Sequence, residues 1–196
     1  MSEREQHGRQ LAYRVFSSEF NQATYRFQES DDDRAPVYVL LPTGAAANRV
    51  FIVGTLTETE DIGTDTEYWR GRIVDPLGTF FVYAGEYQPT VMEALKNAET
   101  PAFAAVTGKP RTYETEDGDI NVSLRPEALT FVDEATRRRW VVETADQTLD
   151  RIQDFTRPDN AYADMAQEHY DVSIETFQDL TIRALESLDA DDSRDT

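Results

Sequence analysis

The spacing of hydrophobic residues divides the chain into an N-terminal extension, a strand-rich middle and a helical end. In the first part, a stretch from residue 3 to residue 24 carries hydrophobic side chains at three- and four-residue steps, which predicts an amphipathic helix. These residues are Leu11, Val15, Phe16, Phe20 and Ala23. The apolar run 37–41 ends at Pro42 and predicts a short strand. We therefore treat residues 1–48 as a helix-and-strand extension.

The middle of the chain, residues 49–132, alternates between hydrophobic and polar residues as β-strands do. We expect five strands, at 50–58, 67–74, 79–84, 102–113 and 120–132. Turn residues separate them at Asp75–Gly78 and at Asp117–Gly118. Pro126 interrupts the last strand and predicts a bulge. A short helix at 90–97 stands between the third and fourth strands.

The last part of the chain is helical. One helix is expected from Asp133 to Arg157, and a second helical stretch from about Asn160. The first carries an apolar stripe of Trp140, Val141, Leu149, Ile152 and Phe155. The second carries a seam of Phe177, Leu180, Ala184 and Leu188. We assign residues 133–188 to this helical region and residues 189–196 to a disordered acidic tail.

Three strands, a short helix and two more strands are the element order of an OB-fold, a small Greek-key barrel. The predicted fold class is therefore α+β, mainly β: a five-stranded OB-fold barrel with an N-terminal helix/strand extension and C-terminal helices. Barrels of this kind bind single-stranded nucleic acid or oligosaccharides on the face of strands two and three. The order of elements thus directs attention to the hairpin at residues 67–84.

Charge adds a second feature. The chain has 38 acidic and 19 basic residues, a net charge of −19, and its only lysines are Lys96 and Lys109. Concentrated salt screens such self-repulsion, so this composition predicts a halophilic protein; a generic acidic protein is the alternative. No cysteine and only two histidines are present, which argues against disulfides, thiol catalysis and a multi-histidine metal site.

Other classes of function lack their sequence signals. No nucleophile elbow, phosphate loop or dinucleotide fingerprint occurs, so we expect no enzyme, no cofactor and no small-molecule substrate. No apolar run approaches the length of a membrane span, and no export leader opens the chain. We therefore expect a cytoplasmic location without membrane contact.

The hairpin at 68–85 interleaves aromatic and basic residues. Alternation places one set of side chains on its outer face: Tyr68, Arg70, Arg72, Phe81 and Tyr83. Rings can stack on bases, and guanidinium groups can contact phosphates or bases, so this set predicts a single-strand interface. The alternatives are ordinary barrel packing for the rings and ion pairs with nearby acids for the arginines. A bulge could also invert the two faces.

A second window favours the same interpretation. Residues 101–113 contain no acid but include Lys109, Arg111 and Tyr113, which we add to the predicted nucleic-acid-binding set. They follow the fourth strand, close to the binding groove of this class of barrel. The alternative is a hairpin whose basic residues have no role in binding.

Several segments resemble a known family, the archaeal replication protein A-associated proteins. They are 53–58, 69–89 and Pro42–Gly44 with Asn48–Arg49, and the likeness covers roughly residues 9–155. The resemblance implies an OB-fold, non-catalytic subunit that binds single-stranded DNA in replication and repair, in a complex with a replication protein A subunit. It points to the hairpin of strands two and three as the DNA-binding element and would place the protein at the nucleoid.

Two hypotheses remain open. In the first, the protein binds single-stranded DNA itself. In the second, it is a scaffold that stabilises or recruits replication protein A without touching DNA, which suits a barrel with fourteen acidic and seven basic residues. The stripe from Trp140 to Phe155 can either cover its own barrel or contact the partner's helices, and we assign it to the partner interface.

Overall fold

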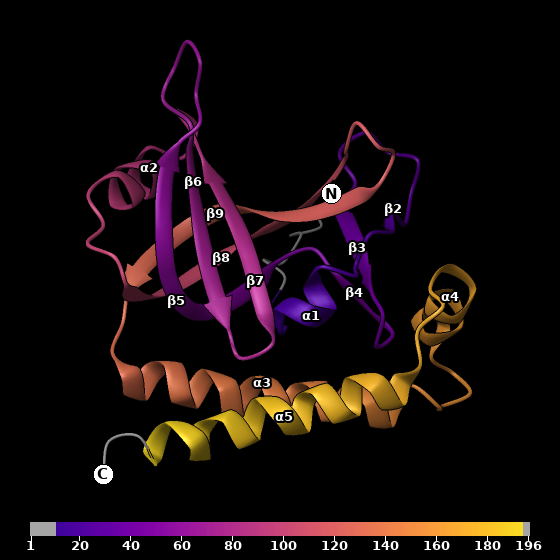
Figure 1. The fold of residues 1–196 in the computed structure, drawn as a ribbon. Coiled ribbons are helices and arrows are strands. Elements are labelled where there is room, and N and C mark those ends of the chain that lie inside the picture. The colour runs from indigo at the N-terminus through magenta and orange to yellow at the C-terminus, as the bar shows by residue number, and fades with distance from the viewer. Residues whose placement is uncertain (1–10, 194–196) are drawn as a thin grey trace, which may run out of the picture.

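The computed structural model describes residues 11–193 and shows an OB-fold barrel resting on C-terminal helices (Figure 1). The order of strands in the main sheet is β1-β5-β6-β7-β9-β8, and an additional pairing of β5 with β8 closes it. Five strands form the barrel: β5 (Val50–Asp61), β6 (Trp69–Asp75), β7 (Gly78–Ala84), β8 (Ala102–Glu114) and β9 (Ile120–Phe131). Helix α2 (Pro89–Lys96) lies between β7 and β8. The predicted fold class and element order are confirmed.

Closure depends on β5, which is long enough to pair on both sides. Its first half pairs with β8, from Val50 to Leu56, and its second half pairs with β6, from Thr55 to Asp61. At Gly54 the chain passes so close to β6 that an added Cβ would lie 2.5 Å from the Val74 carbonyl oxygen. Glycine therefore permits the close approach of the two strands at this point.

The barrel interior contains the inward-facing half of each alternating strand. The fully buried set includes Ile52, Leu56, Ile73, Phe80, Val82 and Leu124. Val91 and Leu95 of α2 join the same core. The expected bulge at Pro126 is also present: Thr107 pairs with Ala128 and Gly108 pairs with Pro126, which leaves one extra residue on β9.

The predicted N-terminal helix is wrong in its described part, and residues 3–10 lie outside the described residues. The chain instead forms β1 (Tyr13–Arg14), parallel to β5, and the four-residue helix α1 (Ser17–Phe20). The helix-like spacing has another cause: Val15, Phe16, Phe20 and Ala23 all insert into the barrel core. Tertiary packing therefore determines this segment.

A small antiparallel sheet follows α1. It consists of β2 (Arg26–Gln28), β3 (Val37–Leu41) and β4 (Ala45–Ala47), of which only β3 was predicted from the sequence. The long hairpin of β8 and β9 reaches past the barrel toward this sheet (Figure 1). Basic residues of the small sheet therefore lie near basic residues of the β8–β9 hairpin.

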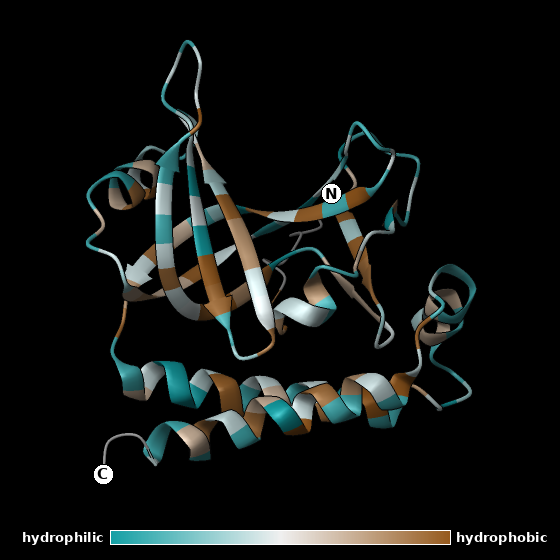
Figure 2. Cartoon of the chain, viewed as in Figure 1, coloured by the Kyte–Doolittle hydropathy of each residue, from teal (hydrophilic) through white to brown (hydrophobic). Residues whose placement is uncertain are grey.

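The C-terminal region contains three helices, where the sequence predicted one helix and one further helical stretch. These are α3 (Glu134–Asp154), α4 (Ala161–His169) and α5 (Ile174–Asp192). Helix α3 begins after its N-cap residue Asp133, and α5 runs alongside α3. Both helices carry a mixture of hydrophobic and hydrophilic residues (Figure 2). Within residues 11–193, no helix is long and apolar enough to cross a membrane.

Helix α5 continues beyond residue 188, where the acidic tail was expected to begin. Its last turn is held by two ion pairs to α3, Arg137 with Asp191 at 2.7 Å and Arg138 with Asp192 at 3.0 Å. Residues 189–192 are therefore helical. Acidic side chains that suggested a solvated tail instead pair with the basic start of α3.

Trp140 and Val141 belong to the protein's own core, which corrects their assignment to a partner interface. Trp140 is 2% exposed, packs edge-on against Phe16 and donates a hydrogen bond from Nε1 to the Phe51 carbonyl oxygen at 3.0 Å. Val141 is fully buried. The rest of the predicted stripe, Leu149, Ile152 and Phe155, is partly buried. The N-terminal part of the stripe, Trp140 and Val141, thus packs in the core that includes the barrel, whereas Phe155 lies beside the β3–β4 turn at Gly44.

A buried ion pair joins the N-terminal segment to α3. Arg151 Nη2 lies 3.0 Å from Glu19 Oε2, and Arg151 Nε donates to the Thr43 hydroxyl at 2.9 Å. The Thr43 hydroxyl in turn donates to Glu19. Buried charges require such partners, so this cluster fixes α1, the β3–β4 turn and α3 relative to one another.

Candidate nucleic-acid interface

The hairpin of β6 and β7 presents the faces that the sequence predicts. Arg70 lies opposite Tyr83, and Arg72 lies opposite Phe81, on the outer face. The alternate residues of both strands point into the barrel core. The bulge that could have inverted the faces occurs on β5, between Leu56 and Glu58, rather than within this hairpin.

The two arginines of β6 differ in their surroundings. Arg70 forms an ion pair with Glu60 at 2.6 Å, and its guanidinium carbon lies 5.7 Å from the centre of the Phe81 ring. Arg72 is exposed and, among the described residues, forms no ion pair. The alternative interpretation, an ion pair with a nearby acid, therefore describes Arg70. Phe81 is partly covered by this same guanidinium.

Tyrosines gather beside this hairpin. The rings of Tyr68 and Tyr83 stack with centroids 5.9 Å apart, and Tyr68 remains 44% exposed. Burial raises the pKa of the Tyr83 phenol, and the neighbouring Tyr113 phenol raises it further, while Arg70 opposes the shift. The phenol of Tyr83 is therefore neutral well above physiological pH. Its neighbours are Tyr68, which lies just before β6, and Tyr113, which lies on β8.

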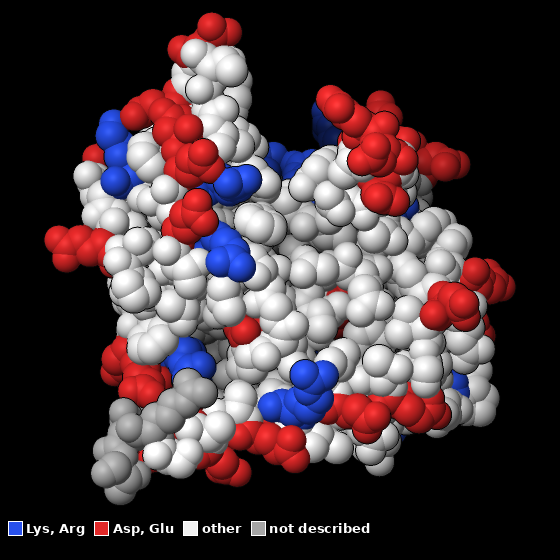
Figure 3. All heavy atoms as spheres, in the orientation of Figure 1, with Lys and Arg blue, Asp and Glu red and all other residues white. Residues whose placement is uncertain are grey.

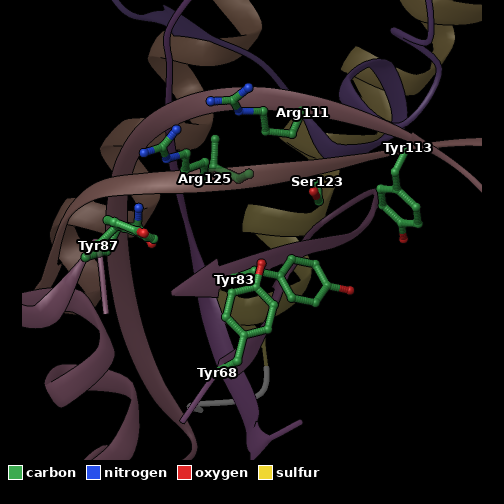
Figure 4. A pocket seen from close by; sticks show the side chains of 9 residues that line it. Tyr68, Tyr83, Tyr87, Arg111, Tyr113, Ser123 and Arg125 are labelled. Atoms are coloured by element: carbon green, nitrogen blue, oxygen red, sulfur yellow. The ribbon is translucent and has the colours of Figure 1, made fainter. Parts of the chain in front are cut away.

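Tyr68 and Tyr83 form one wall of an open groove, which we call the tyrosine groove (Figure 4). Its volume is about 710 Å³. The opposite wall is the β8–β9 hairpin, from which the side chains of Arg111 and Arg125 extend in the same direction. The full lining is Tyr68, Tyr83, Tyr87, Gln88, Arg111, Tyr113, Ser123, Leu124 and Arg125. It contains four aromatic rings, two cations and no acidic residue.

The structure brings together predicted residues from both basic-aromatic windows. Tyr68 and Tyr83 come from the first window, and Arg111 and Tyr113 come from the second. Lys109 lines an adjoining hollow of about 440 Å³ that shares its border with the tyrosine groove. The three other predicted residues lie on the same outer face of β6 and β7 without lining the groove: Arg70, Arg72 and Phe81.

Five residues of the groove were not predicted from the sequence, and two of these, Tyr87 and Arg125, contribute a ring or a charge. Tyr87 follows β7 and is 82% exposed, the most accessible ring of the set. Arg125 pairs across the hairpin with Lys109, so the two side chains share one face with Arg111, which pairs with Ser123. Alternation along β9 could have indicated which face Arg125 occupies. Only the register of β9 with β8 shows that this face is the one that carries Lys109 and Arg111.

The cations of the tyrosine groove and of the adjoining hollow have no acidic partner in the described part of the chain. Among the described residues, Lys109, Arg111 and Arg125 form no ion pair, although acidic residues outnumber basic ones two to one. Figure 3 shows acidic side chains around much of the outline of one face, whereas the middle of this face is mostly uncharged. An anionic ligand could therefore bind here without displacing an internal partner. No group of three potential metal-ligating residues occurs in residues 11–193.

Comparison with solved structures supports the class defined by the barrel, an OB-fold protein. The fold is similar to a chain in the crystal structure of the S. pombe Stn1–Ten1 complex, with a TM-score of 0.58 and 10% identity, over 82% of this chain and 100% of that one. At this identity the likeness concerns the fold. No model of a known protein family matches the sequence, and no curated protein matches it.

Two looser matches each cover less than half of this chain. One is the mitochondrial single-stranded DNA binding protein Rim1 of S. cerevisiae, with a TM-score of 0.34 and 18% identity, over 44% of this chain and 94% of that one. The other is an OBody bound to hen egg-white lysozyme, with a TM-score of 0.38 and 12% identity, over 48% and 89%. The resemblance to replication protein A-associated proteins thus remains a prediction from the sequence.

Proposed function

We propose that this protein is a non-catalytic, single-stranded DNA-binding subunit that acts with a replication protein A partner in DNA replication and repair. The tyrosine groove is the binding site. The observation that carries the proposal is the composition of this groove, which combines four tyrosine rings and no acid with two arginines that form no ion pair among residues 11–193. Protein of this kind would work in the cytoplasm, at the nucleoid.

The groove suits a single strand better than a duplex. Its rings lie on separate elements, with Tyr68 and Tyr83 on one side, Tyr87 at one end and Tyr113 across from them (Figure 4). Unpaired bases expose ring faces that can stack on tyrosine, whereas bases in a duplex are already stacked on each other. Arg111 and Arg125 can contact the phosphates beside the stacked bases.

Partner binding is assigned to the outer side of the C-terminal helices. Val142 on α3 and Ile182 on α5 are hydrophobic and about half exposed, while α3 packs on β1, on β5 and on α5. The family resemblance supplies the kind of partner, a replication protein A subunit. The solved neighbour Stn1–Ten1 is itself a complex of two proteins.

A gel shift with oligothymidylate in molar potassium chloride tests the proposal, with and without a co-expressed replication protein A subunit from the same organism. We expect a shifted band with this protein alone and a further shift with the partner. A shift that requires the partner, and that persists when Tyr83 and Arg111 are replaced by alanine, would favour the second candidate.

That second candidate is an OB-fold scaffold that stabilises or recruits replication protein A without contacting DNA. Two observations favour it: the barrel carries twice as many acidic as basic residues, and Arg70 is already paired with Glu60. The discriminating feature is the tyrosine groove. A scaffold has no use for exposed rings beside free arginines, so replacing them would leave its complex with the partner unchanged.

A further inference from the structure

A second basic hollow adjoins the tyrosine groove. Its volume is about 990 Å³, and it lies between the β2–β3 part of the small sheet and strand β8. Lys109 and Arg111 line both this hollow and the hollow next to the groove. We call it the lateral hollow. A ligand that leaves the tyrosine groove past Arg111 therefore enters it directly.

The lateral hollow is basic within a strongly acidic protein. Five cations line it, against two acids: Arg26, Arg34, Arg49, Lys109 and Arg111, with Glu29 and Asp32. Both acids have partners nearby. Glu29 accepts a hydrogen bond from the Tyr162 hydroxyl, and Asp32 accepts one from the Arg34 backbone N–H at 2.9 Å. These contacts turn the carboxylates toward the protein's own groups.

Most of the cations, in contrast, have no acidic partner. Arg49 is paired with Glu127 at 2.7 Å. Within the described part of the chain, the side chains of Arg26, Arg34, Lys109 and Arg111 form no ion pair. Arg26 and Arg34 are exposed. In a chain where acids are twice as frequent as bases, four unpaired cations around one hollow provide a site for an extended anion.

We infer that the bound strand continues from the tyrosine groove past Lys109 and Arg111 into the lateral hollow, where Arg26 and Arg34 hold its phosphates. This inference rests on the proposed function and specifies the length and chemistry of its site. Tyr38, the aromatic residue that lines the lateral hollow, is buried. Because the buried ring of Tyr38 offers no face on which a base could stack, the lateral hollow holds the strand by its phosphates. In the tyrosine groove, the bases of the strand stack on the tyrosine rings.

The two modes of binding respond differently to salt. Stacking is nearly independent of ionic strength, whereas each phosphate contact to a single strand lowers the slope of log K against log salt by about 0.7. A short strand that fills only the groove should show a shallow slope. A longer strand that reaches Arg26 and Arg34 should show a slope steeper by about 1.4.

The test measures the affinity of the whole protein for oligothymidylates of about 4 to about 16 nucleotides, by fluorescence anisotropy at a series of potassium chloride concentrations. The variant R26Q/R34Q should reduce the slope for the longest strand to that of the shortest, and leave the shortest unchanged. R139Q/R183Q is the matched control, because it removes the same charge from exposed arginines on α3 and α5. This control should behave as the wild type.

The outcomes are distinct. If long strands bind with a slope equal to that of short ones, or if R26Q/R34Q changes nothing, the strand does not enter the lateral hollow, and the proposed function stands without this extension. If R139Q/R183Q has the same effect as R26Q/R34Q, general repulsion explains the result and the inference fails. If no strand of any length binds, the proposed function and this inference fail together.

Discussion

The rings of Tyr68 and Tyr83 stack on each other with centroids 5.9 Å apart and planes inclined by 20°. Tyr68 lies just before β6, and Tyr83 lies on β7 opposite Arg70. Stacking holds each ring in place before any ligand arrives, which lowers the entropy cost of ordering them on binding. The pair therefore forms a rigid platform at one wall of the groove.

Removing one ring of this platform should weaken DNA binding directly. We expect Tyr83→Ala to cost about 1–3 kcal/mol in binding free energy, the range for one lost base stack. The double variant Tyr68→Ala/Tyr83→Ala should cost less than the sum of the two single changes, because each ring positions the other. Isothermal titration with oligothymidylate in molar salt measures all three.

Phe131 supplies the control for this experiment. It is an aromatic residue exposed to a similar extent as Tyr68, at the far end of β9, and it does not line the groove. Phe131→Ala should leave the affinity unchanged. If it weakens binding as much as Tyr83→Ala does, the platform has no special role.

Among the arginines, those of the β8–β9 hairpin should matter more than Arg70. Arg70 must give up its 2.6 Å ion pair with Glu60 to contact a phosphate, whereas Arg111 and Arg125 have no such partner among the described residues. We expect Arg111→Gln and Arg125→Gln each to reduce the affinity several times more than Arg70→Gln. Equal losses for all three, measured by anisotropy at one salt concentration, would contradict this order.

Stability should depend on the buried pair of Glu19 and Arg151. Removing one partner leaves a buried charge without compensation, so we expect Arg151→Met to lower the free energy of unfolding by about 3–5 kcal/mol. Arg157 forms an exposed pair with Asp154 at 3.0 Å, and Arg157→Met should change stability by at most about 1 kcal/mol. Urea unfolding followed by circular dichroism compares the two; similar effects would mean that the buried pair does not fix α3.

The N-cap of α3 gives a pH dependence. Asp133 accepts hydrogen bonds from the side chain and the backbone N–H of Thr136, and these lower its pKa. Because the folded pKa lies below the unfolded value of about 3.9, the stabilisation is complete above that pH and is lost as pH falls through the folded pKa. Asp133→Asn keeps the acceptor but does not titrate, so its unfolding curve should lose this acid-dependent part. Unchanged acid sensitivity of the variant would contradict the assignment.

Local sequence patterns predicted the barrel well, because hydrophobic and polar residues alternate along each strand and turn-forming residues such as glycine and proline separate the strands. The Pro126 bulge and the faces of the β6–β7 hairpin were predicted from such short-range signals. The N-terminal helix failed because Val15, Phe16 and Phe20 satisfy their hydrophobic spacing through contacts with the barrel rather than along a helix. No pattern within 12–24 distinguishes these two causes.

The site was predicted only in part, for a related reason. Tyr83 and Arg111 stood in windows that a basic-aromatic composition marks, whereas Arg125 and Tyr87 stand among acidic neighbours at Glu127 and Glu86. Their place in the groove follows from the register of β8 with β9 and from the path of the chain after β7. Trp140 shows the same limit, since an apolar stripe does not specify whether it covers its own barrel or a partner.

The central claim, that the tyrosine groove binds single-stranded DNA chiefly by stacking, is tested most directly by the salt dependence of a strand short enough to fill only the groove. Two phosphate contacts, from Arg111 and Arg125, predict a slope of log K against log salt of about −1.4. We expect binding of the wild-type protein to persist in molar potassium chloride with this shallow slope, and Tyr68→Ala/Tyr83→Ala to abolish it there. A steep slope, with binding lost in molar salt and unaffected by the two tyrosine substitutions, would contradict the account.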